Sequence, residues 1–457
     1  MTRVLLTGGS GFIAAWVLDL LLQQGHSVVT TVRSRAKADA IKAKHPEYGS
    51  DKLSFAIVPD IAVEGAFDDA VKSDPPFEAV LHTASPFHYN VTDIQKDLLD
   101  PALIGTTSIL KAIKKSAPSV KRVVVTSSFA AVFDPAKGDN PGYPYSEADW
   151  SPLTHEQALE NMVAGYRYSK TSAERAAWDF VEKEKPNFTL STICPPLVLG
   201  PTAPWLASLD NINTSNARVR DAILGKFKEN GEIPPSGVYL WIDVRDLAIA
   251  HVKAMDVPDA AGKRFFTTAG YFSNKEIVEL IRKNFPEYAD KLPPPDVKGG
   301  DYPPGGVYKY DNSRSKEVLG LEFMSLEKSV VDLVNSLKAV GEQFVEFYYK
   351  TFDENRAGLA GLYRDTSMLT FESSEVQGTA SIVEKLTNLP FQKVVHQVAT
   401  LDAQPTQNGI VVLVTGALLV DEEQKPMSYT QLFNIIAESP GSYYVFNDMF
   451  RLVYSAS

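Results

Sequence analysis

The N-terminal part of the chain alternates short apolar runs with amphipathic stretches. In stretches such as Phe12 to Gln24 and Thr106 to Lys114 an apolar residue recurs every three or four positions, which predicts helices. The shorter apolar runs predict buried strands at Arg3 to Leu6, His26 to Val32, Ser54 to Val58, Ala79 to Leu81 and Arg122 to Thr126. Strands that alternate with helices predict an α/β domain with a doubly wound parallel sheet, whose ligand lies at the carboxyl ends of the strands.

After Ala339 the pattern changes. A long amphipathic helix and short helices lead into strands with no helix between them, at Val394 to Leu401, Ile410 to Leu419, Ser428 to Ala437 and Tyr443 to Tyr454. This order predicts a separate α+β domain, a cone in which a curved antiparallel sheet wraps against helices and can enclose an apolar pocket. We divide the chain into domains at 1–338 and 339–457. The junction from Ser329 to Gln343 reads as helix without a Gly/Ser linker, which predicts limited freedom between the domains.

Length, net charge and cysteine content limit which partners and cellular compartments we expect. A chain of 457 residues is long enough for two hydrophobic cores, and its net charge of −11 disfavours nucleic acid or an anionic membrane as the primary partner. The single cysteine, Cys194, forms no internal disulfide and cannot build a metal or redox site alone. Strand-like residues begin at Arg3, which leaves no room for a signal peptide, and no apolar run approaches ~18 residues. We expect a cytosolic or nucleocytoplasmic protein.

A glycine-rich turn follows the first predicted strand. Gly8 lets the turn tighten and Gly11 lets the backbone approach phosphates, while the helix that starts at Phe12 offers free N–H groups. A plain tight turn is the alternative. The position of the turn, directly after the first strand, favours a pyrophosphate site.

Arg33 and Lys37 follow the second predicted strand, where this kind of domain contacts the ribose of a dinucleotide. An acidic residue there would favour NAD, whereas these basic residues suit a 2'-phosphate. A solvated basic loop is the alternative interpretation.

A tyrosine and a lysine are spaced for carbonyl chemistry. Tyr166 and Lys170 are four residues apart, hence on one helix face. A phenol has a pKa of about 10, so a nearby ammonium is needed to let it exchange protons at neutral pH. Ser128, after the strand that ends at Thr126, would hold the substrate oxygen beside Tyr166. The same spacing recurs from Tyr48 to Lys52, but in a predicted loop.

The segments TGGSGFIA, TTVRS, HTASPF, VVVTSSFAAVF, YRYSKTSAERAAWDF and WIDVRDLAIAHV resemble the extended short-chain dehydrogenase/reductases over residues 1–338. The similarity is to the dihydroflavonol reductase-like group with its fungal methylglyoxal and ketone reductases. It implies a Rossmann fold, NADPH-dependent reduction of a small aldehyde or ketone, and catalysis by Ser128, Tyr166 and Lys170. It also implies NADP(H) contacts from Gly8, Gly11, Phe12, Ile13, Arg33, Lys37, Asp60, Tyr166, Lys170 and Pro195. Two departures are Ala14 in place of a third glycine and Cys194-Pro195-Pro196 in place of Asn-Pro.

The segments FYYKTFD, LYRDTSMLTFE, IVEKLTNLPFQKVVH, TLDAQPT and YYVFNDMFRL are similar to nuclear transport factor 2, the carrier of GDP-bound Ran. The resemblance implies that Glu372, Asp421, Glu422 and Glu423 pair with a basic residue of Ran and that Phe371 lines the pocket for a Ran aromatic ring. Read alone, Asp421 to Glu423 is a charged hairpin turn. The resemblance also implies a homodimer through the open sheet face, and a location in cytoplasm and nucleus, including the nuclear envelope. Binding of FxFG nucleoporins is less supported, because Leu337 stands where some members have an aromatic residue.

These expectations combine into a bifunctional chain, a reductase joined to a Ran-binding carrier domain. The competing interpretation is a transport factor whose N-terminal domain is an idle scaffold, and a third is the joining of two neighbouring genes in a predicted coding sequence. The intact trio of Ser128, Tyr166 and Lys170 favours an enzyme. The carbonyl substrate stays open, because Trp205, Phe227 and Tyr239 fit an apolar pocket and a packed core equally well. We expect His396 to be a packed residue.

Overall fold

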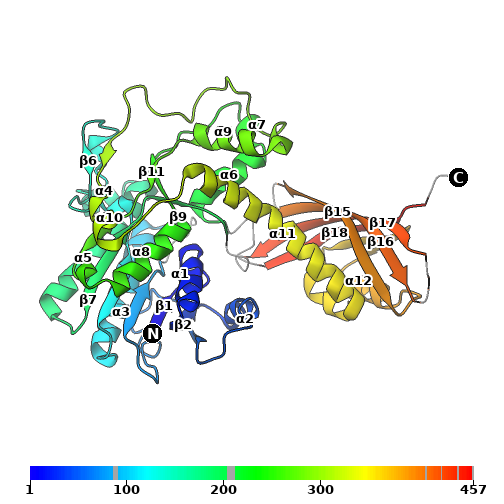
Figure 1. Cartoon of the computed structure of the whole chain (residues 1–457), viewed down its shortest axis with the longest axis horizontal. Helices are drawn as coiled ribbons and strands as arrows, with labels where there is room; N and C mark the ends of the chain where they lie inside the picture. The colour runs from blue at the N-terminus through cyan, green and yellow to red at the C-terminus, as the bar shows by residue number, and fades with distance from the viewer. Residues whose placement is uncertain are drawn as a thin grey trace. The chain divides into compact units, whose positions relative to one another are not determined.

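The computed structural model describes residues 1–85, 91–202, 212–406, 409–421, 423, 425–439 and 442–454, with backbone alone at 339–343, 404–405, 437–439 and 442–443. The chain forms two compact units, each with its own main sheet (Figure 1). The first unit comprises Met1–Trp205, Ile233–Leu280 and Lys298–Val330, and the second comprises Leu206–Glu232, Ile281–Val297 and Val331–Ser457. The predicted boundary at 338 and 339 falls inside one helix, α11 (Leu326–Glu354), and stays a prediction.

The first unit is built on a seven-stranded sheet in which all pairs of neighbouring strands run parallel. In spatial order its strands are β10 (Arg264–Phe266), β7 (Thr189–Cys194), β5 (Arg122–Thr126), β4 (Ala79–His82), β1 (Arg3–Thr7), β2 (Ser27–Val32) and β3 (Leu53–Ile57). The predicted doubly wound parallel sheet is therefore confirmed.

Both faces of this sheet are buried against helices. Val4 and Leu6 of β1 belong to one hydrophobic cluster and Leu5 belongs to the other, because successive strand residues point to opposite faces. The first cluster contains residues of α1 and α8, which lie side by side in Figure 1, and the second contains residues of α3 and α5. The helices of this unit are α1 (Phe12–Gln23), α2 (Arg35–Ala43), α3 (Asp100–Ser116), α4 (His155–Ala158), α5 (Met162–Glu184), α8 (Val244–Asp256) and α10 (Ser313–Leu319).

The strand order reverses between β1 and β4. From β1 the chain proceeds outward through β2 and β3, then returns to the other side of β1 with β4, β5 and β7. A crevice opens outside the carboxyl ends of the two strands that flank such a reversal. Two turns lie there, the glycine turn Gly8 to Gly11 after β1 and Thr83 to Ser85 after β4.

Smaller elements complete the first unit. A three-stranded sheet has the order β11 (Gly270–Tyr271), β9 (Leu240–Asp243) and β8 (Leu197–Leu199), and β6 (Pro144–Tyr145) pairs with β12 (Lys309–Tyr310).

The second unit includes α6 (Thr214–Ile223) and α7 (Lys226–Glu229), and α9 (Asn274–Asn284) runs from a segment of the first unit into one of the second. None of the helices in the described ranges is both long and apolar enough to cross a bilayer.

The second unit contains a six-stranded sheet and the helices α11 and α12 (Thr379–Thr387). The strands β15 (Val394–Thr406), β16 (Gly409–Val420), β17 (Met427–Ser439) and β18 (Ser442–Leu452) pair antiparallel in sequence order, which confirms the predicted α+β arrangement. The hairpin of β13 (Met368–Phe371) and β14 (Ser374–Gln377) was not predicted from the sequence. Its strand β13 pairs parallel with β18, the one parallel pair described in this sheet.

A buried polar network organises the core of the second unit. The Asp448 carboxylate accepts hydrogen bonds from the Tyr348 and Tyr363 hydroxyls at 2.9 and 2.7 Å and from the Gln431 amide at 2.7 Å. Burial nevertheless raises the pKa of Asp448 to about 6. Because three donors satisfy the carboxyl group, the network ties α11 to β17 and β18 without leaving a buried acceptor unpaired.

Candidate active site and C-terminal surface

The glycine turn after β1 requires residues without side chains. Gly8 has φ of +78°, and a Cβ on Gly9 would lie 2.1 Å from the Thr30 hydroxyl oxygen. Gly8 donates its N–H to the Thr31 hydroxyl at 3.0 Å, which fixes the turn against β2. Gly11 precedes α1 without a side-chain cap, and no acidic residue lies in the first helical turn. The free N–H groups around Phe12 and Ile13 therefore fit a pyrophosphate.

Side chains at the ends of β1 and β4 hold the crevice in shape. The Thr7 hydroxyl lies 2.9 Å from His82 Nδ1 and accepts the Ala84 N–H at 3.1 Å, while the Thr83 hydroxyl donates to the Thr7 carbonyl at 2.6 Å. Burial, with a smaller effect from the Lys170 charge, lowers the pKa of His82 to about 4, so its ring is neutral at pH 7. Thr7 and His82 were not predicted as site residues, although His82 directly follows the apolar run Ala79 to Leu81.

The basic and acidic candidates follow the neighbouring strands. Arg33 is exposed directly after β2, and Ser34 then caps α2 by accepting the Lys37 N–H at 3.4 Å. Lys37 is half-buried, and burial lowers the pKa of its ammonium below the ordinary value. Asp60 is exposed after β3, and its carboxylate accepts the Ala62 N–H at 2.8 Å. Arg33 thus lies at the carboxyl end of β2, the neighbour of β1, Lys37 lies in the first turn of α2, and Asp60 follows β3, the neighbour of β2.

Tyr166 and Lys170 lie on the first half of α5, which Asn161 caps by accepting the Ala164 N–H at 3.0 Å. The Lys170 Nζ is 5.8 Å from the centroid of the Tyr166 ring and donates to the Ser85 hydroxyl at 2.8 Å. Burial lowers the pKa of Lys170 to about 8. The other pair with the same spacing, Tyr48 and Lys52, lies in the non-helical segment between α2 and β3.

Ser128 follows β5 and begins the single 3-10 turn Phe129–Ala131, against which α5 packs. Ser128 is half-buried, and its Oγ accepts the Ala130 N–H at 3.1 Å. The Pro195 carbonyl accepts the Phe129 N–H at 2.8 Å, so the residues after β7 also touch this turn. Burial raises the pKa of Cys194 to about 12, so its thiol stays neutral and is no nucleophile.

Two of the three aromatic residues that could have lined a substrate pocket are instead packed in the protein core. Phe227 and Tyr239 are buried, and the Tyr239 ring lies 5.7 Å from the Tyr302 ring. Trp205 lies outside the described residues. Phe227 and Tyr239 therefore belong to the core and do not identify the substrate.

In the second unit Phe371 and Glu372 lie at the hairpin between β13 and β14. The Phe371 ring stacks on Phe450 at 4.5 Å. Glu372 has φ of +55° and donates its N–H to the Phe450 carbonyl at 3.0 Å, while its carboxylate accepts the Leu452 N–H. The acid is thus held half-buried at the end of the sheet.

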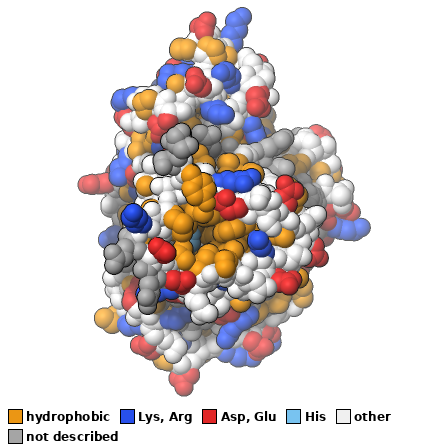
Figure 2. All heavy atoms as spheres, turned by 90° about the vertical axis from the view of Figure 1, so that its right-hand side faces the viewer, with side chains coloured by type: hydrophobic (Ala, Val, Ile, Leu, Met, Phe, Trp, Pro, Cys, Tyr) orange, Lys and Arg blue, Asp and Glu red, His pale blue; other side chains and the backbone are white. Residues whose placement is uncertain are grey.

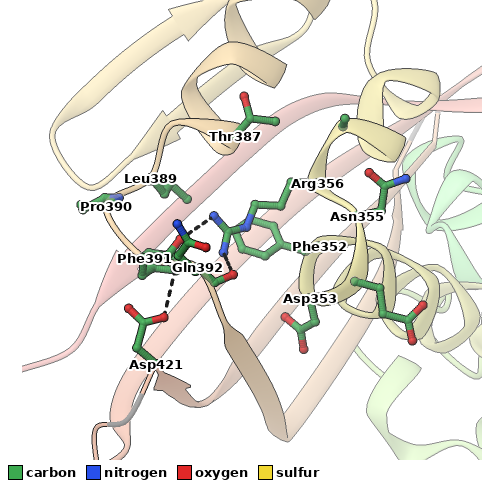
Figure 3. Close-up of a pocket in the computed structure, with 12 residues that line it drawn as sticks. Phe352, Asp353, Asn355, Arg356, Thr387, Leu389, Pro390, Phe391, Gln392 and Asp421 are labelled. Carbon is green, nitrogen blue, oxygen red and sulfur yellow. Dashed lines mark hydrogen bonds between the residues drawn. The ribbon is translucent and has the colours of Figure 1, made fainter.

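Asp421 borders a pocket of about 590 Å³ in the second unit (Figure 3). Its carboxylate accepts the N–H groups of Gln392 and Lys393 at 3.0 and 2.8 Å. Inside the pocket the Arg356 guanidinium lies over the rings of Phe352 and Phe391, at 5.3 and 4.5 Å. The lining does not include the other described candidates, Phe371, Glu372 and the exposed Glu423, and Glu422 lies outside the described residues.

The remaining candidates of the second unit are packed side chains. His396 stacks on Tyr349 at 4.4 Å, and its Nδ1 lies 2.6 Å from the Asp353 carboxylate. Leu337 is buried on α11. These positions fit a role in the core.

One face of the six-stranded sheet exposes apolar side chains. Leu413, Leu432 and Met449 are neighbours across β16, β17 and β18, and Leu413 and Met449 are 39% and 44% exposed. Val395 and Met368 are exposed on β15 and β13. Separately, the face of the molecule seen in Figure 2 carries hydrophobic side chains around a hollow whose rim has acidic and basic side chains. Exposed apolar patches with polar rims are typical of binding surfaces.

Comparisons with known proteins match two separate parts of the chain. Residues 4–266 match the model of the NAD dependent epimerase/dehydratase family, and residues 340–452 match that of the nuclear transport factor 2 (NTF2) domain. The chain is 48% identical over 337 residues to the ketoreductase azaE of Aspergillus niger, covering 73% of this chain and 97% of that protein. It is 66% identical over 121 residues to nuclear transport factor 2 of Emericella nidulans, covering 26% of this chain and 97% of that protein.

The fold of the first half is similar to solved reductase structures. Gre2 from Candida albicans in complex with NADPH matches with a TM-score of 0.67 and 35% identity, covering 74% of this chain and 98% of that chain.

Proposed function

This chain belongs to the NAD-dependent epimerase/dehydratase family in its N-terminal half and to the nuclear transport factor 2 family in its C-terminal half, and from that premise we propose that it is bifunctional. Residues 1–338 reduce a small aldehyde or ketone with NADPH. Residues 339–457 bind GDP-bound Ran. The main observation behind the enzymatic part is that α5 carries both Tyr166 and Lys170 and that Lys170 donates a hydrogen bond to Ser85, which follows β4.

The residues around the crevice fit NADP(H). The side-chain-free turn at Gly8 and Gly11 and the uncapped start of α1 at Phe12 and Ile13 suit the pyrophosphate. Arg33 and Lys37 at the end of β2 suit a 2'-phosphate, and Asp60 and Pro195 complete the proposed contacts. The related structure of Gre2 holds NADPH, which supports this choice of cofactor. When bound, NADPH supplies the hydride that reduces the carbonyl carbon.

The protein's own groups supply the proton and orient the substrate. The Ser128 hydroxyl accepts the Ala130 N–H and keeps a hydrogen with which to donate to the carbonyl oxygen. Tyr166 gives that oxygen a proton, which completes the alcohol. The Lys170 ammonium, 5.8 Å from the Tyr166 ring, stabilises the negative charge left on the phenol oxygen.

For the carrier half, the proposed Ran contacts are Phe371, Glu372, Asp421, Glu422 and Glu423. Support comes from the 66% identity to a nuclear transport factor 2 and from Glu372 being held at the sheet end by the Leu452 N–H. The exposed row of Leu413, Leu432 and Met449 supports a homodimer through the open sheet face. Such a carrier works in cytoplasm and nucleus, and binding of FxFG nucleoporins is a further part of the proposal.

One purified protein tests both halves. We expect the full chain to oxidise NADPH when given small aldehydes or ketones, to prefer NADPH over NADH, and to bind GDP-bound Ran in calorimetry. Ran binding without any carbonyl-dependent NADPH oxidation would favour the alternative in which the first unit is an idle scaffold.

A further inference from the structure

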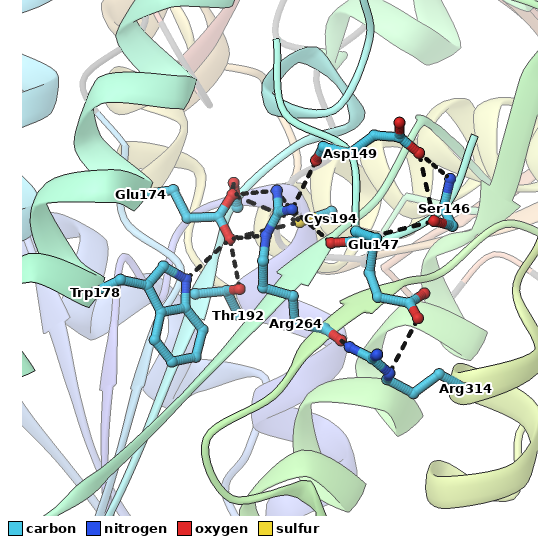
Figure 4. A network of polar contacts seen from close by, with 11 residues as sticks. Ser146, Glu147, Asp149, Glu174, Trp178, Thr192, Cys194, Arg264 and Arg314 are labelled. Atoms are coloured by element: carbon cyan, nitrogen blue, oxygen red, sulfur yellow. Dashed lines mark hydrogen bonds and ion pairs between the residues drawn. The ribbon is translucent and has the colours of Figure 1, made fainter. Parts of the chain in front are cut away.

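A buried carboxylate ties the helix that carries Tyr166 and Lys170 to three strands (Figure 4). Glu174 lies one turn beyond Lys170 on α5 and is 2% exposed. Its carboxylate accepts the Ser127 hydroxyl from the end of β5 and the Thr192 hydroxyl of β7, each at 2.6 Å. The Arg264 guanidinium of β10 donates to the same group at 2.8 and 3.1 Å.

The buried charges of Glu174 and Arg264 are balanced by each other and by hydrogen bonds from neighbouring groups. Burial alone would raise the pKa of the Glu174 carboxyl, yet the Arg264 charge and the hydrogen bonds from Arg264, Ser127 and Thr192 hold that pKa below its ordinary value. Arg264 also lies 3.6 Å from the Trp150 ring and donates to the carbonyls of Glu147 and Asp149. A buried charge with this many partners fixes the geometry of the elements that supply them.

We infer that Glu174 is a positioning residue of the reductase, acting through its hydrogen bond to Ser127. Ser127 is the chain neighbour of Ser128, and Glu174 shares α5 with Tyr166 and Lys170. The bond is thus a short link between the two elements from which the catalytic groups project. This inference rests on the proposed function, since it concerns the alignment of that trio.

The hydrogen bonds to Glu174 offer a matched pair of variants. Ser127→Ala and Thr192→Val each remove one buried hydroxyl that donates to Glu174 at 2.6 Å, and both leave Arg264 in place. Both variants should lose comparable stability in thermal unfolding, because each loses a hydrogen bond to the same charged group. Only Ser127 adjoins a proposed catalytic residue.

The test is steady-state NADPH oxidation by the full chain at a temperature where wild type and both variants are folded. For Ser127→Ala we expect kcat to fall about tenfold with KM and NADPH affinity near normal, and for Thr192→Val we expect kcat within about twofold of wild type. Equal kcat losses in the two variants, or none in Ser127→Ala, would overturn the inference and leave the reductase assignment intact. Lack of carbonyl reduction by wild type would instead overturn the proposed function.

Glu174→Ala gives a second check at a temperature where that variant is folded, because alanine leaves no acceptor for the Ser127 hydroxyl. If Ser127 acts through Glu174, the variant that carries both Ser127→Ala and Glu174→Ala should have about the same kcat as Glu174→Ala alone, because either change removes the same hydrogen bond. Independent, multiplicative losses would contradict the proposed link.

Discussion

The Lys170 ammonium on α5 donates a hydrogen bond over 2.8 Å to the hydroxyl of Ser85, which follows β4. The helix α5 and the turn after β4 therefore meet at one side chain. Because burial lowers the pKa of Lys170 to about 8, this ammonium is largely charged at neutral pH and loses its proton under mildly alkaline conditions.

The pH dependence of reduction should follow this group. A lysine with a lowered pKa keeps its charge below that pKa, so kcat/KM should hold at neutral pH and fall as the pH rises through about 8. Ser85→Ala removes an acceptor that favours the charged form and should move the fall to lower pH. A pH profile for both proteins measures this. A profile that stays flat through mildly alkaline pH in wild type would contradict the role of Lys170.

Cofactor preference should depend on Arg33. Removing a charge-assisted contact to the 2'-phosphate costs roughly 1.5 to 3 kcal/mol, or ten- to a hundredfold in affinity. Arg33→Ala should therefore weaken NADPH binding by that factor and leave NADH binding unchanged, as measured by fluorescence titration. Arg35→Ala is the control, because Arg35 is exposed and pairs with Asp39 at 3.6 Å. Equal losses of affinity for NADPH and NADH would contradict the assignment of Arg33 to the 2'-phosphate.

Binding of GDP-bound Ran should depend on the charge of Glu372. Glu372→Lys replaces a pairing contact with like-charge repulsion and should weaken binding at least about tenfold in calorimetry. Glu375→Lys, an equally large change at an exposed position of β14, should bind like wild type.

Folding controls are needed for this prediction, because the Glu372 carboxylate also accepts the Leu452 N–H. Glu372→Gln keeps an acceptor and removes the charge, so it should unfold like wild type and bind Ran more weakly. If Glu372→Gln and Glu372→Lys both bind with wild-type affinity, the site lies elsewhere.

The oligomeric state should depend on the open sheet face. Leu413 is 39% exposed beside Leu432, so Leu413→Arg places a charge in the proposed two-fold interface and should convert the dimer to a monomer in light scattering. Leu103→Arg is a matched control, because Leu103 of α3 is also 39% exposed but lies in the first unit. A wild-type monomer, or a dimer that only Leu103→Arg disrupts, would be inconsistent with this interface.

The sequence predicted those elements whose signal is local. The apolar run at Arg122 to Thr126 became β5 with the same bounds, because a buried parallel strand needs apolar residues on both faces. Gly8 has the left-handed conformation that its turn demands, and the spacing of Tyr166 and Lys170 put both on α5.

Features that depend on residues far apart in the sequence could not be predicted. Glu174 joins Ser127 and Arg264, which are 47 and 90 residues away, and no local pattern distinguishes it from a solvated glutamate. The hairpin of β13 and β14 was missed because its strands, MLTF and SEVQ, mix apolar and polar residues and form no continuous apolar run. The Ran contacts from Phe371 to Glu423 and the domain boundary at 338 stay predictions.

The most direct test of the reductase assignment is the turnover of Tyr166→Phe, which removes the proton donor and keeps the ring. Steady-state NADPH oxidation with a small aldehyde or ketone should show kcat lowered by about 10² or more, with NADPH affinity near normal. Tyr168→Phe on the same helix is the control, since Tyr168 packs edge-on against His155 and should turn over like wild type. Wild-type turnover by Tyr166→Phe would contradict the account.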